Sequence, residues 1–348
     1  MLHITIQPHW RIGREREPEA AVDANSLLEL LTAINETGGI APAARAIGVS
    51  YRHAWGLIKR AEALFGHALL EAGRGRGSSL TEFSRRLVWA DARIAARLQP
   101  LLESLASELE VELDRSLAHP HTVLRLHASH GFAVAALLEQ LETKHLAIEL
   151  RYRSSFEAVA ALARGECDLA GFHVPIGEFE AAAAERYLHW LRAREHSLIH
   201  LAVRTQGLFV AAGNPKSIST LADLVRSDVR FVNRPTGSGT RLLTEMLFER
   251  HGIDAQQVAG YDNTELTHAA VAAFVASGMA DAGIGVKTAA HRFGLHFIRC
   301  SRSAITSPCR RNRCRAPRCV RCSRCCSRAP TAPRWRRWWA TRRARRAR

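Results

Sequence analysis

The sequence lacks the features that mark an exported or a membrane-embedded protein. Residues 1–298 contain a single cysteine, Cys167, so this part of the chain cannot form an internal disulfide. Such usage is typical of proteins in a reducing compartment. The first residues contain no basic segment followed by an apolar one, and no apolar run is long enough to span a membrane. We therefore expect a cytoplasmic protein that does not enter the membrane.

The sequence also lacks the residue patterns of an enzyme. It shows no Ser/His/Asp pattern at a nucleophile elbow and no H-E-x-x-H motif, and its Asp and Glu residues are scattered. We expect no catalytic residues, no required cofactor and no metal ligands in the body of the chain. A metabolic enzyme on an α/β fold stays an alternative, because a fold alone does not exclude one.

Acidic residues are absent from residues 299–348, and this absence accounts for the formal net charge of +16. Of the 49 Lys and Arg residues, 18 lie in that tail, which leaves 31 against 33 Asp and Glu in residues 1–298. The body of the chain is therefore close to neutral. Residues 37–86 contain eight Lys and Arg residues but only three acidic residues, so this segment is locally basic. A local excess of this kind says more about a DNA contact than the charge of the whole chain.

Residues 1–81 show the parts of a winged helix-turn-helix. Residues 2–12 partly alternate and predict a short strand pair. A helix follows Asp23 and ends at Gly38-Gly39, and a short Ala-rich helix covers residues 42–47. After a turn at Gly48-Val49, Ser50 is a strong N-cap for a third helix that runs to about Phe65. This order is typical of a DNA-binding domain.

The third helix and the loop that follows it contain the candidate DNA contacts. One face of the helix is apolar and the other is basic and aromatic, and the glycine-rich loop 73–81 suits a wing that lies along phosphates. The predicted DNA-binding residues are Ser50, Tyr51, Arg52, His53, Trp55, Lys59, Arg74 and Arg76. The alternative is an ordinary amphipathic helix followed by a solvated loop.

Residues 82–121 predict a long linker helix, which Pro100 should kink or split. Its apolar seam consists of Ile94, Leu98, Leu101, Leu105, Leu109 and Leu113. A seam of this length needs a partner, and we favour a second copy of the chain, hence a homodimer, over packing against the body.

In residues 122–298, strand and helix patterns alternate, which predicts one or two open α/β sheets. Several strands end in small polar residues just before a helix, where free backbone N–H groups and hydroxyls suit an anion. The alternative is simple helix capping. The candidate ligand-binding residues are Ser129, His130, Ser154, His173, Thr205, Gln206, Asn233, Ser238, Gly239, Thr240 and Arg241.

Two family resemblances extend this interpretation. The segment AAR-x-x-GVSY-x-x-AW-x-x-I and the later LT-x-x-x-x-R-L, within residues 20–95, resemble ModE-type, molybdate-responsive regulators and, more distantly, LysR-type regulators. The stretches LHASHGFAVAALLE, RFVNRP-x-GSGTRLL and THAAVAAFVASGMADAGIGV resemble periplasmic-binding-protein-like domains, including molybdate-binding proteins. These resemblances imply a dimer on a palindromic operator and a two-lobed domain with a ligand in its cleft. The likeness stops after residue 298.

The fold class we expect is α+β multidomain, with a winged helix-turn-helix at 1–81, a linker helix at 82–121 and a two-lobed periplasmic-binding-protein-like domain at 122–298. The predicted function is a transcriptional regulator that binds double-stranded operator DNA and senses a small anion, with molybdate or tungstate first. The alternatives are a regulator that senses a small organic ligand and a solute-binding module without specific DNA binding.

The tail, residues 299–348, contains no Asp, Glu, Lys, Leu, Gly, Phe, Tyr, Met, Gln or His. Leucine is among the commonest residues in proteins, so a segment of this length without it is not a normal fold. We interpret it as a GC-rich coding region read in the wrong frame. We expect disorder after about residue 299 and an exposed sheet edge or apolar face on the sensor domain. The alternatives are an Arg-rich nucleic-acid tail and a zinc cluster of Cys309, Cys314, Cys319, Cys322, Cys325 and Cys326.

Overall fold

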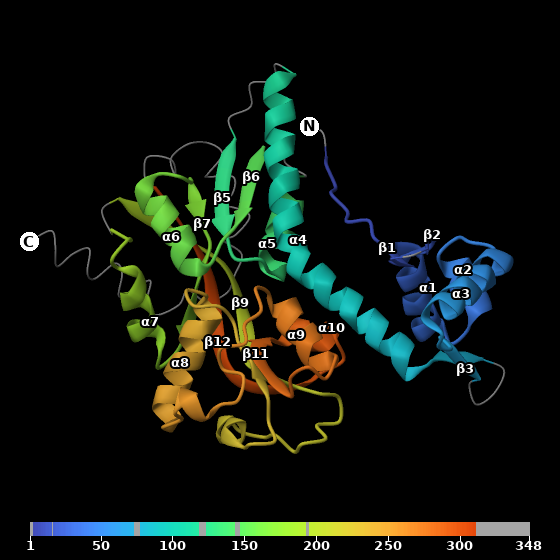
Figure 1. Ribbon diagram of the computed structural model, residues 1–348. Helices are drawn as coiled ribbons and strands as arrows, with labels where there is room; N and C mark the ends of the chain where they lie inside the picture. The colour runs from blue at the N-terminus through green and yellow to red at the C-terminus, as the bar shows by residue number, and fades with distance from the viewer. Residues whose placement is uncertain are drawn as a thin grey trace, which may run out of the picture. The chain divides into compact units, whose positions relative to one another are not determined.

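The computed structural model describes residues 3–15, 17–72, 77–117, 123–142, 147–192 and 195–310. The chain forms two compact units (Figure 1). Residues 7–95 make up the smaller unit, and residues 1–6 and 96–348 make up the larger one. The division falls inside the long linker helix. The larger unit therefore includes the second half of that helix.

The smaller unit is a helix-turn-helix with two small hairpins. Its elements are β1 (Arg11–Arg14), β2 (Glu17–Asp23), α1 (Ala24–Thr37), α2 (Ile40–Ala46), α3 (Tyr51–Phe65), β3 (Leu70–Ala72) and β4 (Ser78–Leu80). The strands pair as β1 with β2 and β3 with β4, both antiparallel. Leu30, Leu31 and Ile34 of α1 are fully buried against Ile58 of α3 and form the centre of the core.

The strand pair predicted within residues 2–12 is wrong in position, because the hairpin begins only at Arg11. Backbone groups just before it bond to a side chain instead of a second strand. The Asn25 side chain donates to the carbonyl of Pro8 at 2.9 Å and accepts from the amide of Trp10 at 3.0 Å. The alternating pattern in the sequence gives no sign that the Asn25 side chain would take up these backbone groups.

The linker helix α4 runs unbroken from Glu82 to Ser116 with Pro100 inside it, so the predicted split does not occur. A proline cannot donate to the carbonyl four residues earlier. Here the carbonyl of Ala96 accepts a hydrogen bond from the Thr267 hydroxyl at 3.2 Å instead.

The larger unit contains an eight-stranded sheet. Its strands are β5 (Leu124–Ala128), β6 (Ile148–Tyr152), β7 (Leu169–Ala170), β8 (Phe172–Ile176), β9 (His196–Val210), β10 (Phe231–Val232), β11 (Ala282–Val286) and β12 (His296–Arg310). Their order is β10-β11-β9-β12-β7-β5-β6, and β8 also pairs with β12. The helices are α5 (Phe132–Glu142), α6 (Ser155–Arg164), α7 (Glu180–Tyr187), α8 (Gly239–His251), α9 (His268–Ala276) and α10 (Lys287–Arg292), with short 3₁₀ turns at Leu221–Val225 and Ala255–Gln257.

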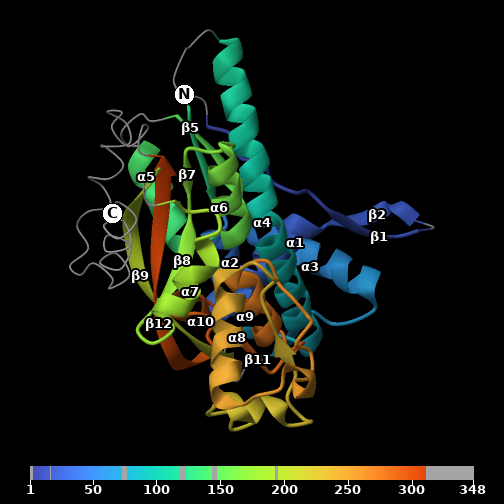
Figure 2. The ribbon, with the colours of Figure 1, turned by 90° about the vertical axis from the view of Figure 1, so that its left-hand side faces the viewer.

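Two long strands, β9 and β12, join the two lobes of this sheet. Each has 15 residues, and they pair antiparallel from His296 opposite Val210 to Arg310 opposite His196. Figure 2 shows them running side by side. One end of the pair joins β10 and β11, and the other end joins β5 to β8. The predicted two-lobed α/β arrangement is therefore confirmed.

The expectation of disorder from about residue 299 is wrong for residues 299–310. These residues form most of β12, which lies between β9 and the pair β7 and β8. Strand pairing uses backbone groups, so a segment without leucine can still occupy the middle of a sheet. Its inward residues are small, and Ser303, Ala304 and Thr306 are buried. Residues 311–348, including the rest of the proposed zinc cluster, lie outside the described residues.

Across the described ranges, no helix combines the length and the apolar character needed to cross a membrane.

Candidate functional site

Helix α3 presents a polar and aromatic face on the smaller unit. The Ser50 side chain accepts a hydrogen bond from the amide of His53 at 3.1 Å and begins the helix, as predicted. Leu57 and Ile58 are buried on one face. The side chains on the other face are exposed, namely Tyr51, Arg52, His53, Trp55, Lys59 and Arg60. The geometry therefore separates a packing face from a face open to a partner.

The exposed aromatic residues of α3 form a continuous surface. The rings of Tyr51 and Trp55 are stacked, with centroids 6.4 Å apart and an interplanar angle of 11°. The Lys59 ammonium lies 4.7 Å from the centre of the Trp55 ring, which suits a cation–π contact. The same ammonium forms an ion pair with Glu62 at 2.8 Å, which a phosphate would have to replace. The stacked rings themselves are compatible with a nucleic-acid contact.

The predicted wing is a short hairpin after α3. Strands β3 and β4 pair from Leu70 opposite Leu80 to Ala72 opposite Ser78. The amide of Ser78 donates to the carbonyl of Gly38 at 3.1 Å, so the end of α1 supports the hairpin. Residues 73–76, with the predicted contacts Arg74 and Arg76, lie outside the described residues.

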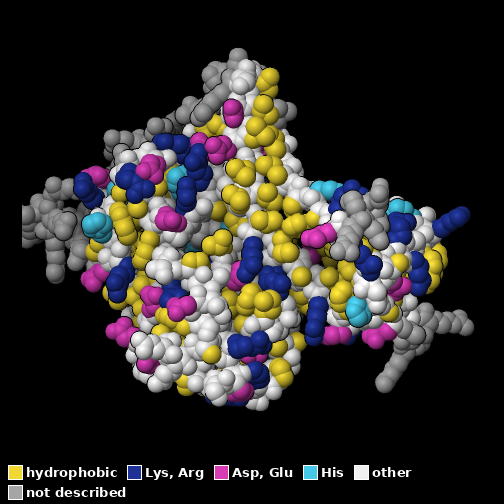
Figure 3. All heavy atoms as spheres, in the orientation of Figure 1, with side chains coloured by type: hydrophobic (Ala, Val, Ile, Leu, Met, Phe, Trp, Pro, Cys, Tyr) yellow, Lys and Arg dark blue, Asp and Glu magenta, His cyan; other side chains and the backbone are white. Residues whose placement is uncertain are grey.

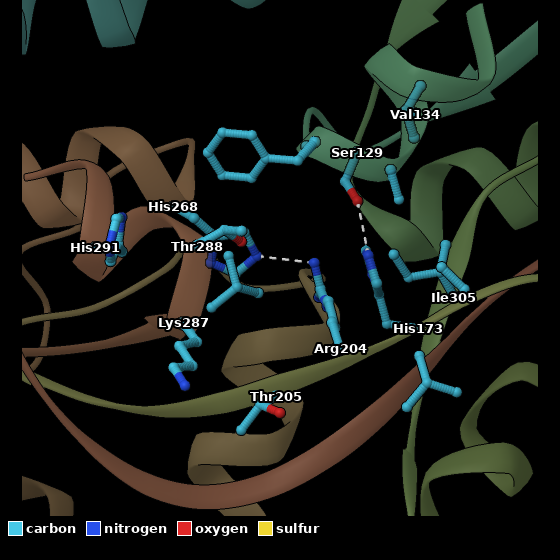
Figure 4. A pocket seen from close by; sticks show the side chains of 16 residues that line it. Ser129, Val134, His173, Arg204, Thr205, His268, Lys287, Thr288, His291 and Ile305 are labelled. Atoms are coloured by element: carbon cyan, nitrogen blue, oxygen red, sulfur yellow. Dashed lines mark hydrogen bonds between the residues drawn. The ribbon is translucent and has the colours of Figure 1, made fainter. Parts of the chain in front are cut away.

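The larger unit contains a cavity of about 420 Å³ where the long strands cross between the lobes. Figure 4 shows its charged and polar side chains on several elements. Apolar side chains make up much of the rest of its wall. The lining residues are Ser129, Gly131, Phe132, Ala133, Val134, His173, Ala202, Val203, Arg204, Thr205, His268, Val286, Lys287, Thr288, His291 and Ile305.

Arg204, on β9, is the central charged group of the cavity wall. Its Nη1 donates to Nε2 of His268 at 3.0 Å, and its Nε donates to Oγ of Ser303 at 3.2 Å. With the Gln206 amide oxygen turned toward it, Nη2 donates there at 2.9 Å. Burial, followed by the charge of Arg234, lowers the pKa of Arg204 to about 9. The guanidinium is therefore still charged at neutral pH.

Arg234, two residues after the end of β10, is a second buried guanidinium, although it does not line the cavity. It is 4% exposed, and burial lowers its pKa to about 10. Its Nη2 donates to the carbonyl of Leu266 at 2.6 Å, while its Nε has no hydrogen-bond partner among the described residues. Within the described ranges, no carboxylate forms an ion pair with Arg204 or Arg234. Two buried positive charges without a counter-ion are costly, so the arrangement suits an anion.

His173, on β8, lies between the hydroxyl of Ser129, which was predicted to bind an anion, and that of Ser155, the neighbour of the predicted Ser154. Its Nδ1 lies 3.0 Å from Oγ of Ser155, and its Nε2 lies 3.5 Å from Oγ of Ser129. Burial, followed by the charges of Arg204 and Arg234, holds the pKa of His173 well below its ordinary value, so the ring is neutral. These two hydroxyls therefore bond to an imidazole.

His268 begins α9 on the opposite wall. In Figure 4 its ring points toward Arg204. Burial, followed by the charges of Arg234 and Arg204, holds its pKa well below the ordinary value. A neutral ring accepts the Arg204 hydrogen bond at Nε2, so Nδ1 carries the hydrogen. That Nδ1 is buried without a hydrogen-bond partner.

The structure brings only some of the predicted ligand residues to the cavity. Ser129, His173 and Thr205 line it. The others lie outside its lining and have structural contacts. Ser154 and Ser238 cap α6 and α8, and a Cβ on Gly239 would lie 2.8 Å from Cβ of His173. His130 packs edge-on against Tyr152, and the side chains of Gln206 and Thr240 lie 3.5 Å apart. Asn233 and Arg241 both donate a hydrogen bond to the carbonyl of Tyr261.

Arg204 in the cavity wall and the buried Arg234 were not among the predicted ligand residues. Arg204 lies in the middle of an apolar strand pattern, and Arg234 lies two residues after a buried strand. A charged residue at such a position must have a partner or a function, and this signal was available in the sequence. Ile305 and Ser303 were missed because they lie in the tail that was expected to be disordered.

Comparisons with protein families agree with the two units. Residues 26–85 match the model of the bacterial regulatory helix-turn-helix proteins of the lysR family. Residues 136–321 match the model of the PBP superfamily domain, which is more than half of the chain. The chain therefore belongs to the PBP superfamily, and it joins a LysR-type helix-turn-helix domain to a PBP-like domain. The second match also extends beyond residue 298, where we expected the likeness to end.

One curated relative and several solved structures are similar to the chain. The uncharacterized protein YvgK of Bacillus subtilis (strain 168) is 36% identical over 151 residues, which are 42% of this chain and 48% of the relative. The chain thus spans about half the length of this relative. An H₂O₂-bound mutant of Corynebacterium glutamicum OxyR is 15% identical, with 87% of this chain and 91% of that chain covered and a TM-score of 0.44. CbnR, described as a LysR family transcriptional regulator, is 20% identical, with 86% and 99% covered and a TM-score of 0.40.

Proposed function

We propose that this protein is a ligand-responsive transcriptional regulator of the LysR type. Its helix α3 binds operator DNA, and its cavity between the lobes binds a small anionic effector. The match of residues 26–85 to the lysR family supports the DNA-binding part. The single observation that supports the effector part is Arg204, a buried guanidinium in the cavity wall without a described carboxylate partner, whose pKa is lowered further by the charge of the buried Arg234.

Between the two effector classes considered, the geometry favours a small organic anion over a tetrahedral oxyanion. The hydroxyls of Ser129 and Ser155 both approach His173, so they do not converge on an empty space. The cavity volume of about 420 Å³ lies within the range of about 300–1,000 Å³ that is usual for sites of small organic molecules. Phe132, Val134 and Ile305 provide an apolar wall for the body of such a ligand. Molybdate and tungstate remain the inorganic alternative.

The exposed face of α4 supports the proposal of a homodimer. Leu101, Leu105 and Leu109 are 57%, 45% and 41% exposed and recur every four residues. Figure 3 shows hydrophobic side chains lined up along this part of α4. An apolar stripe of this kind is stabilised when a second helix covers it. A second copy of the chain, acting on a palindromic operator in the cytoplasm, is the partner that we propose.

A solute-binding module without DNA binding is the weaker alternative. The exposed Tyr51, Trp55 and Lys59 of α3 have no evident use in such a protein, whereas they suit a nucleic-acid surface.

The effector class is tested by thermal unfolding of the full chain with sodium molybdate, tungstate, sulfate and benzoate. An anion present at a hundred times its Kd stabilises the folded state by about 2.7 kcal/mol. We expect a rise in melting temperature with benzoate that is absent in Arg204→Gln. Stabilisation by molybdate alone would instead support the oxyanion. Equal stabilisation of both proteins would contradict an effector site at Arg204.

A further inference from the structure

The segment Glu265–His268 bonds alternately to α4 and to the charged wall of the cavity. The Glu265 carboxylate, which is 3% exposed, accepts hydrogen bonds from Nε of Arg97 on α4 at 3.0 and 2.8 Å, and Nη2 donates as well. The carbonyl of Leu266 accepts from Arg234 at 2.6 Å. Neighbouring residues of one short segment therefore bind the linker helix and the buried Arg234, whose charge acts on Arg204 in the cavity wall.

The next two residues repeat this alternation. The Thr267 hydroxyl donates to the carbonyl of Ala96 on α4 at 3.2 Å, and it accepts from the amide of Ala270 at 2.9 Å, which caps α9. His268 then accepts the hydrogen bond of Arg204 at 3.0 Å. Each residue of the segment that bonds to Arg204 or Arg234 is therefore the direct neighbour of a residue that bonds to α4.

Pro100 is the reason that Thr267 can bond to the linker helix. In an uninterrupted helix the amide of residue 100 would donate to the carbonyl of Ala96. Proline has no such hydrogen, so this carbonyl is open to a donor from outside the helix. Thr267 supplies that donor. The same missing bond makes position 100 a point where α4 can bend.

Beyond Pro100, α4 is attached to the other lobe. The hydroxyl of Ser104 accepts from the amide of Tyr152 at 3.1 Å, and that of Ser107 accepts from the amide of Leu150 at 2.8 Å. Both amides belong to β6, at the far end of the sheet from β10 and β11. The helix is therefore fixed to one lobe before Pro100 and to the other lobe after it.

We propose that the segment Glu265–His268 couples effector binding to α4, with Pro100 as the point at which the helix responds. This inference rests on the proposed effector site. An anion in the cavity lies against residues of both lobes, Ser129 and His173 on one side and His268 on the other, so it changes the spacing of the lobes. A helix fixed to both lobes must then adjust where it lacks a hydrogen bond. Because α4 begins at Glu82, directly after the wing, the adjustment reaches the DNA-binding unit. The effector thereby alters operator affinity through a differential contact in the two states.

Hydrogen exchange of the full-length protein tests the coupling at residues 97–104 of α4. The cavity is perturbed in two ways, by sodium benzoate or molybdate and, without any ligand, by Arg204→Gln. We expect each effective perturbation to change the exchange rate of these amides by about fivefold or more. In Thr267→Val the same perturbations should leave the rate nearly unchanged, whereas Thr267→Ser, which keeps the hydroxyl, should respond like the wild type.

A second variant separates coupling from loss of the α9 cap. Pro100→Ala gives residue 100 an amide hydrogen for the Ala96 carbonyl and leaves α9 intact, so it should also reduce the response. Gln99→Ala, at an exposed neighbouring position outside the leucine stripe, is its control and should respond normally. The proposal is overturned if the exchange rate of α4 changes as much in Thr267→Val and in Pro100→Ala as it does in the wild type. It is also overturned if Arg204→Gln leaves the exchange rate of α4 unchanged in the wild-type background. Failure of every anion to bind would contradict the effector proposal alone, because the Arg204→Gln comparison needs no ligand.

Discussion

At the scale of single residues, Arg204 is the group on which the proposed effector site depends. It lies on a strand that crosses between the lobes, it is buried, and its described partners are the neutral groups Ser303, His268 and Gln206. Neutral acceptors satisfy its hydrogen bonds but leave its charge unbalanced. An anion in the cavity would balance it at short range, where the low dielectric strengthens the attraction.

The first prediction concerns this charge. Arg204→Gln keeps a hydrogen-bonding side chain but removes the positive charge, so the affinity for benzoate should fall at least about tenfold, since a charge-assisted hydrogen bond contributes roughly 1.5–3 kcal/mol. Isothermal calorimetry measures the change. Arg230→Gln, at a surface position paired with Asp281, is the matched control and should bind as the wild type does. Equal losses in both variants would point to general electrostatics rather than to a site.

The second prediction concerns pH. The pKa of His268 is held well below its ordinary value of 6.5 in the folded protein, so below about pH 6.5 the unfolded chain binds more protons than the folded one. Stability should therefore fall as the pH drops from 6.5, by up to about 1.4 kcal/mol per pH unit for this group. Urea unfolding at pH 5.5, 6.0 and 6.5 measures the slope.

The pH experiment needs a variant to isolate one histidine. His268→Asn can still accept a hydrogen bond from Arg204 but does not titrate, so its stability should depend less steeply on pH than that of the wild type. A variant His268→Asn with the full wild-type slope would show that this histidine is not neutral in the folded protein.

At the scale of elements, the sequence predicted what local pattern determines. The N-cap Ser50, the C-terminal glycines and the apolar face of α3 are local features, and α3 has the predicted bounds. The alternation of strands and helices after residue 122 was likewise visible. Features that depend on distant partners are harder to predict. The long strand β12 is held by pairing on both sides and was missed. The long helix α4 was predicted, but not that it passes Pro100 without a split, where the Thr267 hydroxyl bonds to the carbonyl that proline leaves free.

The third prediction concerns α3 and the wing. Arg52 is exposed in the first turn of α3, where a recognition helix contacts base edges, so Arg52→Ala should abolish most of the sequence preference, about 1–3 kcal/mol. Arg76→Ala, in the proposed wing, should weaken binding to all duplexes alike and reduce the salt dependence by about one unit of slope. Gel-shift titrations at several salt concentrations compare them. Unchanged affinity in both variants would contradict the assignment of α3 and the wing.

At the scale of the whole molecule, two family domains are joined by one helix that belongs to both units. The helix α4 begins in the smaller unit and continues into the larger one, where Arg97, Ser104 and Ser107 attach it to the two lobes. The chain therefore has a continuous covalent and hydrogen-bonded route from the cavity to the DNA-binding unit. Dimer formation through the exposed leucines would bring two such routes together.

The fourth prediction concerns the tail. The composition of residues 299–348 still predicts a coding region read in the wrong frame, although residues 299–310 form a strand. The family match to residue 321 argues against a frame change as early as residue 299, so the expected change lies further along the tail. Resequencing the locus, with mass spectrometry of the C-terminal peptides of the natural protein, should give a different sequence within the tail. The tail as printed, found together with stoichiometric zinc, would overturn this hypothesis in favour of a metal cluster.

The central claim is that an anion in the cavity controls specific DNA binding, and one measurement tests it most directly. Full-length protein is used to select duplexes from a random library, and the affinity for the selected duplex is then measured with and without benzoate or molybdate. We predict an inverted repeat with half-sites about one helical turn apart. We also predict a change in affinity of about fivefold or more with the effective anion, which is lost in Arg204→Gln. Selection of no preferred sequence, or an affinity that no anion changes in the wild type, would contradict the account.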